Sequence, residues 1–206
     1  VGIKSFGRYA LFEVLQSKIN PDVVYFSLKN GLAIGKVDGE GNFLEIRYLE
    51  GLNDECQKII ENKNGDLWVQ TAYNYLLKVE ASSFVEGNEL KYKKYEQEEK
   101  LAPEDFIFYK GEVLFSSKKG LMAFEENKGF YPYQDLKLPL DSSYEITRMI
   151  QDSDKNLWGH YHTNEGVSGE FYAKTTSNGF KIFTEPFTRL KEKIIHVQTP
   201  YIDGNI

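Results

Sequence analysis

The stretch IIENKNGDLWVQTAYNYLLKV, from Ile59 to Val79, decides how this sequence is expected to fold. Two short runs rich in Ile, Leu, Val and Trp flank a turn of sequence Asn-Lys-Asn-Gly-Asp, and a third apolar run, Leu76–Val79, follows a second loop. Apolar runs separated by an Asn-Gly turn are typical of neighbouring antiparallel strands. The stretch therefore predicts three consecutive antiparallel strands joined by short turns.

The same order of turn and strands recurs along the chain. The large apolar residue after the turn stands at four equivalent positions, which are Tyr25, Trp68, Leu114 and Trp158. These positions are 43, 46 and 44 residues apart, and a fifth turn follows at Asp203–Asn205. Each unit also has a fourth, more polar strand, such as Leu90–Tyr95. Four antiparallel strands in a period of roughly 40–50 residues are the signature of a β-propeller blade.

We therefore expect an all-β fold, a propeller segment of four-stranded antiparallel blades. The expected blades cover residues 10–50, 51–97, 98–138 and 139–190, and a partial fifth blade covers 191–206. A single four-stranded sheet cannot bury both of its faces, so the blades must stack on one another. The four large residues after the turns are expected to anchor this packing, because such side chains bury a large area between blades. We expect the segment to be completed by the rest of a longer chain or by a second copy.

Composition restricts the class of protein further. Aromatic residues make up 15% of the 206 residues, which favours pleated sheet. The formal charge of −6 argues against a nucleic-acid partner, for which a basic patch is expected. The single cysteine, Cys56, excludes an internal disulfide framework. No run approaches the ~20 apolar residues that a membrane-spanning helix needs. We expect both ends to be cut from a longer chain.

The copies around Trp68 and Trp158 resemble the two-component regulator propeller repeat. The matching residues are Gly65, Leu67, Trp68 and Thr71 in one copy and Asp152, Asn156, Leu157 and Trp158 in the other. The other two copies keep the Gly-Leu pair of the repeat, at Gly31-Leu32 and Gly120-Leu121, and lack its Trp. Similarity at the level of the repeat extends from about residue 11 to residue 206.

The resemblance implies the periplasmic sensor part of a membrane-anchored regulator of the hybrid histidine kinase type. Regulators of this kind, as in gut Bacteroidetes-like glycan sensors, commonly respond to glycan fragments. The resemblance therefore implies an oligosaccharide or another small ligand. It does not imply kinase activity, because the kinase part of such regulators has no counterpart here.

No catalytic residue and no cofactor are predicted. The sequence has no G-x-S-x-G elbow, P-loop or dinucleotide fingerprint. His160 and His162 have a spacing that permits joint metal coordination, but no third ligand is near them in the sequence, and no metal site is predicted. One alternative is a propeller enzyme similar to streptogramin lyases, in which His160, His162 and Glu165 would surround a magnesium ion. Another is a structural or protein-interaction propeller without a small ligand.

Ligands of propellers usually lie on the loops between the second and third strands of the blades. By that rule the expected binding residues are Tyr73, Asn74, Lys118, His160, His162, Asn164 and Glu165. Such side chains suit a sugar, whose hydroxyl groups need polar partners and whose ring stacks on aromatic faces. The best candidate is the stretch from His160 to Glu170, expected to form a long loop with the third strand resuming only near Glu170. The alternative for this stretch is an ordinary long hairpin.

Overall fold

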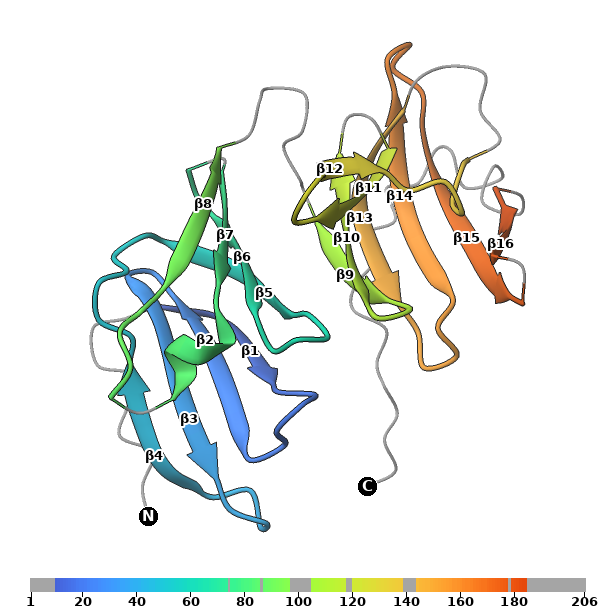
Figure 1. Cartoon of the computed structure of the whole chain (residues 1–206). Helices are drawn as coiled ribbons and strands as arrows, with labels where there is room; N and C mark the ends of the chain where they lie inside the picture. Colours follow the sequence, from blue (N-terminus) through green and yellow to red (C-terminus); the bar gives the residue numbers. More distant parts are fainter. Residues whose placement is uncertain are drawn as a thin grey trace. The chain divides into compact units, whose positions relative to one another are not determined.

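The computed structural model of the chain describes residues 10–73, 75–85, 87–96, 105–117, 120–138, 144–177 and 179–184. It contains four antiparallel sheets of four strands each, in which strands that follow one another in the sequence are neighbours (Figure 1). Within the described residues the only helical element is a short 3-10 helix, η1 (Ala81–Phe84). The expected all-β fold of four-stranded antiparallel blades is therefore confirmed. The expected fifth blade, 191–206, lies outside the described residues.

The chain divides into two compact units. The first contains two sheets, with strands β1 (Leu11–Gln16), β2 (Val23–Leu28), β3 (Gly31–Val37), β4 (Phe43–Tyr48), β5 (Cys56–Glu61), β6 (Leu67–Thr71), β7 (Tyr75–Val79) and β8 (Tyr92–Glu96). The second contains β9 (Phe106–Tyr109), most of β10 (Glu112–Ser117), β11 (Gly120–Glu125), β12 (Gly129–Pro132), β13 (Tyr144–Gln151), β14 (Leu157–Thr163), β15 (Ser168–Thr176) and β16 (Gly179–Phe183).

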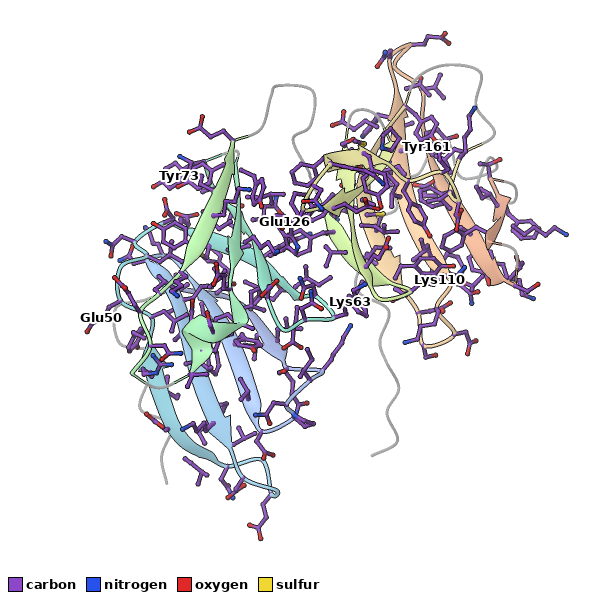
Figure 2. The ribbon with its side chains drawn as sticks, viewed as in Figure 1. Glu50, Lys63, Tyr73, Lys110, Glu126 and Tyr161 are labelled. Atoms are coloured by element: carbon purple, nitrogen blue, oxygen red, sulfur yellow. The ribbon has the colours of Figure 1, made fainter. Side chains whose placement is uncertain are left out.

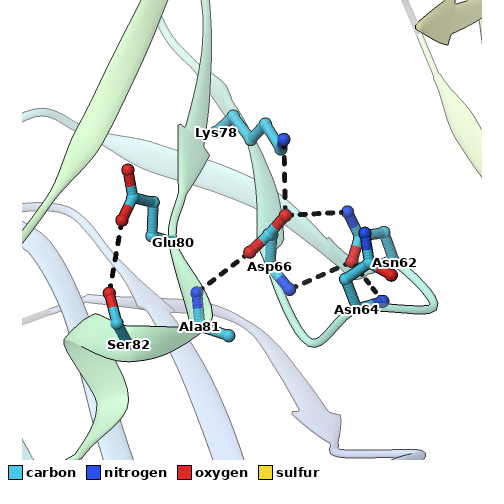
Figure 3. Close-up of polar contacts among 7 residues, drawn as sticks. All are labelled: Asn62, Asn64, Asp66, Lys78, Glu80, Ala81 and Ser82. Atoms are coloured by element: carbon cyan, nitrogen blue, oxygen red, sulfur yellow. Dashed lines mark hydrogen bonds and ion pairs between the residues drawn. The ribbon is translucent and has the colours of Figure 1, made fainter. Parts of the chain in front are cut away.

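The turn between β5 and β6 is closed by a pair of side chains, Asn62 and Asp66 (Figure 3). The Asn62 side-chain oxygen accepts the backbone N–H groups of Asn64 and Asp66, at 2.8 and 3.0 Å, and its amide group donates to Asp66 Oδ2 at 3.1 Å. Asp66 also accepts the N–H of Ala81 at 3.0 Å and lies 3.3 Å from Lys78 Nζ. The pair therefore satisfies the polar groups of the turn and ties it to the chain after β7.

The same turn occurs between β13 and β14 with the two side chains exchanged. The Asp152 carboxylate accepts the N–H of Asn156 at 2.9 Å and its amide group at 3.0 Å. The fourth residue has positive φ in both turns, +86° at Gly65 and +66° at Lys155. These two copies of the repeat therefore share the turn, and either order of Asn and Asp can build it.

Alternate residues of facing strands form the core of the first unit, because successive side chains of a strand point to opposite sides of the sheet. The buried members are Tyr25, Leu32, Ile34, Leu49, Leu52, Cys56, Ile59, Leu67, Val69, Leu77 and Val79. They come from both sheets of this unit and from the segment that joins them. Each such side chain stabilises the fold by about 1.5–3 kcal/mol relative to an exposed one.

The core of the second unit is also built from alternate residues of facing strands, and it contains several aromatic rings. On β14 the residues Leu157 and Tyr161 point into it, and Phe171 of β15 is fully buried. Gly159 lies between the first two, and a Cβ atom there would be 2.3 Å from the Phe171 ring. This copy of the repeat therefore has glycine where the copy around Trp68 has Val69, because the Phe171 ring of the adjacent strand occupies the space of a side chain.

An equivalent hydrogen bond joins the two sheets of each unit. In the first unit Glu13 Oε2 accepts the backbone N–H of Ile59 at 2.7 Å, and in the second Asp105 Oδ2 accepts that of Met149 at 3.0 Å. Each carboxylate lies in or just before the first strand of one sheet, and each N–H belongs to the first strand of the next. A buried N–H without a partner costs about 1–3 kcal/mol, so these bonds favour the stacking of consecutive sheets.

Three of the four large residues after the turns are buried, and the fourth is not. Tyr25, Trp68 and Leu114 are 5%, 2% and 0% exposed, whereas Trp158 is 37% exposed. The prediction of a buried anchor at Trp158 is therefore wrong. The alternation of β14 directs Leu157 into the core of the second unit and Trp158 to the opposite side of the sheet, where the surrounding residues cover it only in part.

Candidate functional site

Among the described residues of the first unit, the aromatic side chain with the largest exposed fraction lies at one end of the β5–β8 sheet. Tyr73 is in the short connection between β6 and β7, and it is 62% exposed (Figure 2). Its backbone N–H donates to Thr71 Oγ1 at 3.3 Å, and the Thr71 hydroxyl donates to the carbonyl of Tyr75 at 2.9 Å. The threonine that ends β6 therefore holds the connection in a compact turn. Asn74, the next predicted residue, lies outside the described residues.

Tyr73 stacks on Tyr75, the first residue of β7. The two ring centroids are 6.2 Å apart and the rings are nearly parallel, with an angle of 17° between their planes. The Nζ atom of Lys94 lies 3.8 Å from the centroid of the Tyr75 ring and 3.4 Å from Glu96 Oε1. An ammonium group over an aromatic face is attracted by the ring quadrupole. The lysine and the two tyrosines therefore form one ordered group at this end of the sheet.

The hydroxyl of Tyr75 donates to a carboxylate oxygen of Asp54, in the segment between β4 and β5. Burial raises the pKa of Tyr75, and the hydrogen bond to Asp54 and its negative charge raise it further. The phenol therefore keeps its proton throughout the physiological range. A carboxylate has about four acceptor positions, so Asp54 can accept further hydrogen bonds while it holds Tyr75.

Backbone contacts fix the segment that carries Asp54. The N–H of Gly31 donates to the Asp54 carbonyl at 2.8 Å, and the N–H of Ala72 donates to the Glu55 carbonyl at 3.0 Å. Gly31 has a φ of +102°, and a Cβ atom there would be 2.2 Å from the Leu52 carbonyl oxygen. The glycine that begins β3 is thus required for this close approach, which places Asp54 beside Tyr75.

The prediction of a long loop from His160 to Glu170 is wrong. β14 continues to Thr163 and β15 begins at Ser168, so this stretch is an ordinary long hairpin. Thr163 closes it: its N–H donates to the Val167 carbonyl at 2.7 Å, and its carbonyl accepts the N–H of Gly166 at 3.0 Å. The alternation of β14 remains regular past His160, and regular alternation of two paired strands favours strand over loop.

His160 and His162 lie on the same side of β14, and their ring centroids are 4.5 Å apart. His160 Nδ1 is 2.9 Å from Thr147 Oγ1, and His162 Nδ1 is 2.5 Å from Ser168 Oγ. Burial lowers the pKa of His160, and the charge of neighbouring His162 lowers it further. His160 is therefore neutral near pH 7.

The described part of the structure does not bring the other predicted site residues together. Asn164 and Glu165 are exposed in the turn of the β14–β15 hairpin, and Lys118 lies outside the described residues. Tyr73 belongs to the first unit, and the two histidines belong to the second. Each group is therefore a separate candidate site.

Sequence reasoning missed three members of the group around Tyr73, which are Asp54, Tyr75 and Lys94. The Tyr-x-Tyr spacing at the start of β7 was a usable signal for Tyr75, since alternate residues of a strand share a face. Lys94 and Asp54 come from other segments, and only the pairing of β7 with β8 and the fixed β4–β5 connection bring them to this point.

No set of three or more His, Cys, Asp and Glu side chains in the described part of the chain is arranged to hold a metal ion. No helix in that part has the length and apolar character needed to cross a membrane.

The fold is similar to that of two solved propeller-type structures. One is the extracellular domain of BT3049 from B. thetaiotaomicron, described as a hybrid two-component system, with a TM-score of 0.51 and 16% identity over 85% of this chain. The other is the Dos1 propeller, with a TM-score of 0.50 and 15% identity over 85% of this chain. The chain spans 22% of the first structure and 47% of the second. At such low identity the likeness concerns the fold alone. The chain matches no protein-family model, and no curated protein matches its sequence.

Proposed function

We propose that this chain is an extracytoplasmic, ligand-binding propeller segment of a two-component signalling receptor, and that its ligand is a glycan. The sensor part of the proposal is supported by the fold-level likeness to the extracellular domain of BT3049. It is supported independently by the repeat around Trp68 and Trp158, which resembles the two-component regulator propeller repeat. In this proposal the chain lies in the periplasm and the signalling output belongs to other parts of the receptor.

The observation that carries ligand binding is the group of Tyr73, Tyr75, Lys94 and Asp54. Tyr73 offers an exposed ring that is supported from behind by Tyr75, so it can stack on a sugar without first being ordered. Asp54 supplies hydrogen-bond acceptors and Lys94 supplies donors beside the Tyr75 ring. An aromatic face flanked by a few fixed polar groups is the usual composition of a small-ligand site.

A thermal-shift screen tests this proposal. The full chain is mixed with malto-, xylo-, manno- and galacturono-oligosaccharides, and a ligand that binds only the folded protein raises its apparent stability. The responding sugar is then titrated by calorimetry into the parent protein and into Tyr73→Ala. We expect the substitution to remove most of the affinity while the melting temperature without ligand stays near that of the parent, because Tyr73 is mainly exposed.

Tyr92→Ala is the matched control. Tyr92 is another exposed tyrosine of the same sheet, at the start of β8, and it is not part of the Tyr73 group. Equal loss of affinity in both variants, or unchanged affinity in Tyr73→Ala, would contradict a site at this position.

The proposal also assigns a role to the side of the β13–β16 sheet on which Trp158 lies. The remaining sheets of the propeller come from the rest of the same receptor chain or from a second copy, and they pack on this side of β13–β16. The support is the equivalence of Trp158 with Trp68, which is buried. Size-exclusion chromatography of Trp158→Lys tests the second-copy form: if the parent associates and the variant is monomeric, two copies meet at this side.

A further inference from the structure

The β14–β15 hairpin is longer than the β6–β7 hairpin of the first unit. β14 has seven residues and β15 nine, whereas β6 and β7 have five each. β16 pairs with β15 only from Tyr172 to Thr176, so the part of β15 from Ser168 to Phe171 has no partner on that side among the described pairings. The hairpin therefore extends beyond β16, as Figure 1 shows. His162 lies on this extension.

Residues directly opposite one another in antiparallel strands share a face, so two rows of side chains cross β13, β14 and β15 on the same side of the sheet. Arg148, His160 and Glu170 form one row, and Glu145, His162 and Ser168 form the other. These rows hold two carboxylates and one guanidinium, so the charged groups around the two rings favour a cation. Glu145 adds a separate observation, because its Oε1 atom is buried and has no hydrogen-bond partner.

The hydroxyl contacts prepare both rings as metal ligands. Thr147 Oγ1 and Ser168 Oγ can each accept a hydrogen bond from the Nδ1–H group of the adjacent ring. In that tautomer the Nε2 atom of each ring carries the lone pair, and an N–H donated to a second group in this way orients metal-bound histidines in proteins. Imidazole suits Zn²⁺ and Cu²⁺. Nitrogen ligands lie about 2.0–2.1 Å from zinc, so the two Nε2 atoms must come within about 4 Å of each other. Ring centroids 4.5 Å apart allow that approach.

We propose that His160 and His162 form a two-histidine site for a late first-row divalent cation, Zn²⁺ or Cu²⁺, toward the turn of this hairpin. Both Nε2 atoms bind the ion, Glu145 opposite His162 becomes a third ligand after a change of side-chain rotamer, and water completes the coordination. The histidines lie on paired strands, so the chelate is largely organised before the ion arrives. The site belongs to the second unit and does not depend on the glycan proposal, which concerns Tyr73 in the first.

Calorimetric titration of ZnCl₂ into the full chain, free of any affinity tag, tests the proposal. The expected result is one ion per chain for the parent and loss of measurable binding in both His160→Gln and His162→Gln. The chain has three histidines, so His196→Gln is the matched control and is expected to bind like the parent. Binding that persists in either single variant, or a parent that does not bind, would overturn the two-histidine site.

A second measurement separates direct coordination from a change in folding. Trp158 lies two residues before His160 on the same side of β14, so bound Cu²⁺ is expected to quench its fluorescence in a Trp68→Phe background, where it is the only tryptophan left. Thr147→Val removes the hydroxyl beside His160 and is expected to weaken the affinity about 10–100-fold, the usual effect of losing such a partner. Quenching that is unchanged in the His160→Gln, His162→Gln double variant would contradict the site.

Discussion

The sheets β5–β8 and β13–β16 are two copies of one repeat that have different surroundings. Both place a tryptophan as the second residue of their second strand and in the same register: Trp68 of β6 pairs with Ile60, and Trp158 of β14 pairs with Ile150. Both close the preceding turn with an Asn and an Asp. Yet Trp68 is 2% exposed and Trp158 is 37% exposed.

The difference shows that the repeat fixes the direction of a side chain and that its surroundings fix its burial. Trp158 uses local partners: its ring centroid is 4.4 Å from that of Tyr172, and its Nε1–H donates to Asp152 Oδ2 at 3.3 Å. In the other copy the residue opposite Trp68 is Lys78, which pairs with Asp66, and the Trp68 ring lies 5.2 Å from Tyr95. Equivalent positions can therefore contribute very differently to stability.

The largest expected effect is on the two tryptophans. Trp68→Ala should lower the free energy of unfolding by about 3–5 kcal/mol, the range for emptying a buried aromatic site. Trp158→Ala should cost about 1 kcal/mol or less, because partly exposed side chains contribute less. Urea denaturation of both variants measures the difference, and equal losses would show that the two tryptophans have the same surroundings.

The second effect concerns the exchanged side chains of the turns. Asn62→Asp places two carboxylates side by side and should cost about 1–2 kcal/mol through the lost amide donor. Adding Asp66→Asn restores a donor and reproduces the order found at Asp152 and Asn156. The double variant should therefore lose less stability than the sum of the single variants. Strict additivity in this double-mutant cycle would mean that the pair does not act as a unit.

The third effect is at the residue with positive φ. Gly65→Lys imposes a side chain at a φ of +86°, with its Cβ atom 3.3 Å from that of Ala81, and should destabilise by about 1–2 kcal/mol. Lys155→Gly relieves the same constraint in the other copy, and it should stabilise by a few tenths of a kcal/mol, roughly, because the added entropy of the unfolded chain offsets part of the gain. Thermal melting of both proteins compares them, and a destabilised Lys155→Gly would contradict the argument.

The smallest effect is a dependence on pH. Burial opposes the charged form of Asp152, but the hydrogen bonds from Asn156 and Trp158 outweigh it and hold the pKa of Asp152 below its usual value. The resulting stability is present above the unfolded-state pKa, near 4, and is lost as pH falls through the lower folded-state pKa. The parent should therefore lose slightly more stability than Asp152→Asn when unfolding is measured at pH 5 and again at pH 3. An identical loss in both would show that Asp152 contributes nothing to this dependence.

Much of the fold could be predicted from the sequence because the information is local. The turn at Asn62–Asp66, the alternation of the strands and the spacing of Trp68 and Trp158 all lie within short stretches. The exposure of Trp158 could not be predicted, since it depends on what lies on one side of a sheet. Of the Tyr73 group, only Tyr73 was identified, because Asp54 and Lys94 reach it through strand pairing and a fixed connection.

The most direct test of the ligand-binding claim is hydrogen exchange of the full chain, measured by mass spectrometry with and without the oligosaccharide that responds in the thermal-shift screen. We expect slower exchange in peptides that cover residues 52–56, 72–76 and 92–96, which carry Asp54, Tyr73, Tyr75 and Lys94. We expect no change in peptides that cover residues 157–170. Protection confined to the β14–β15 hairpin would contradict a site at Tyr73 and would place the ligand on the second unit.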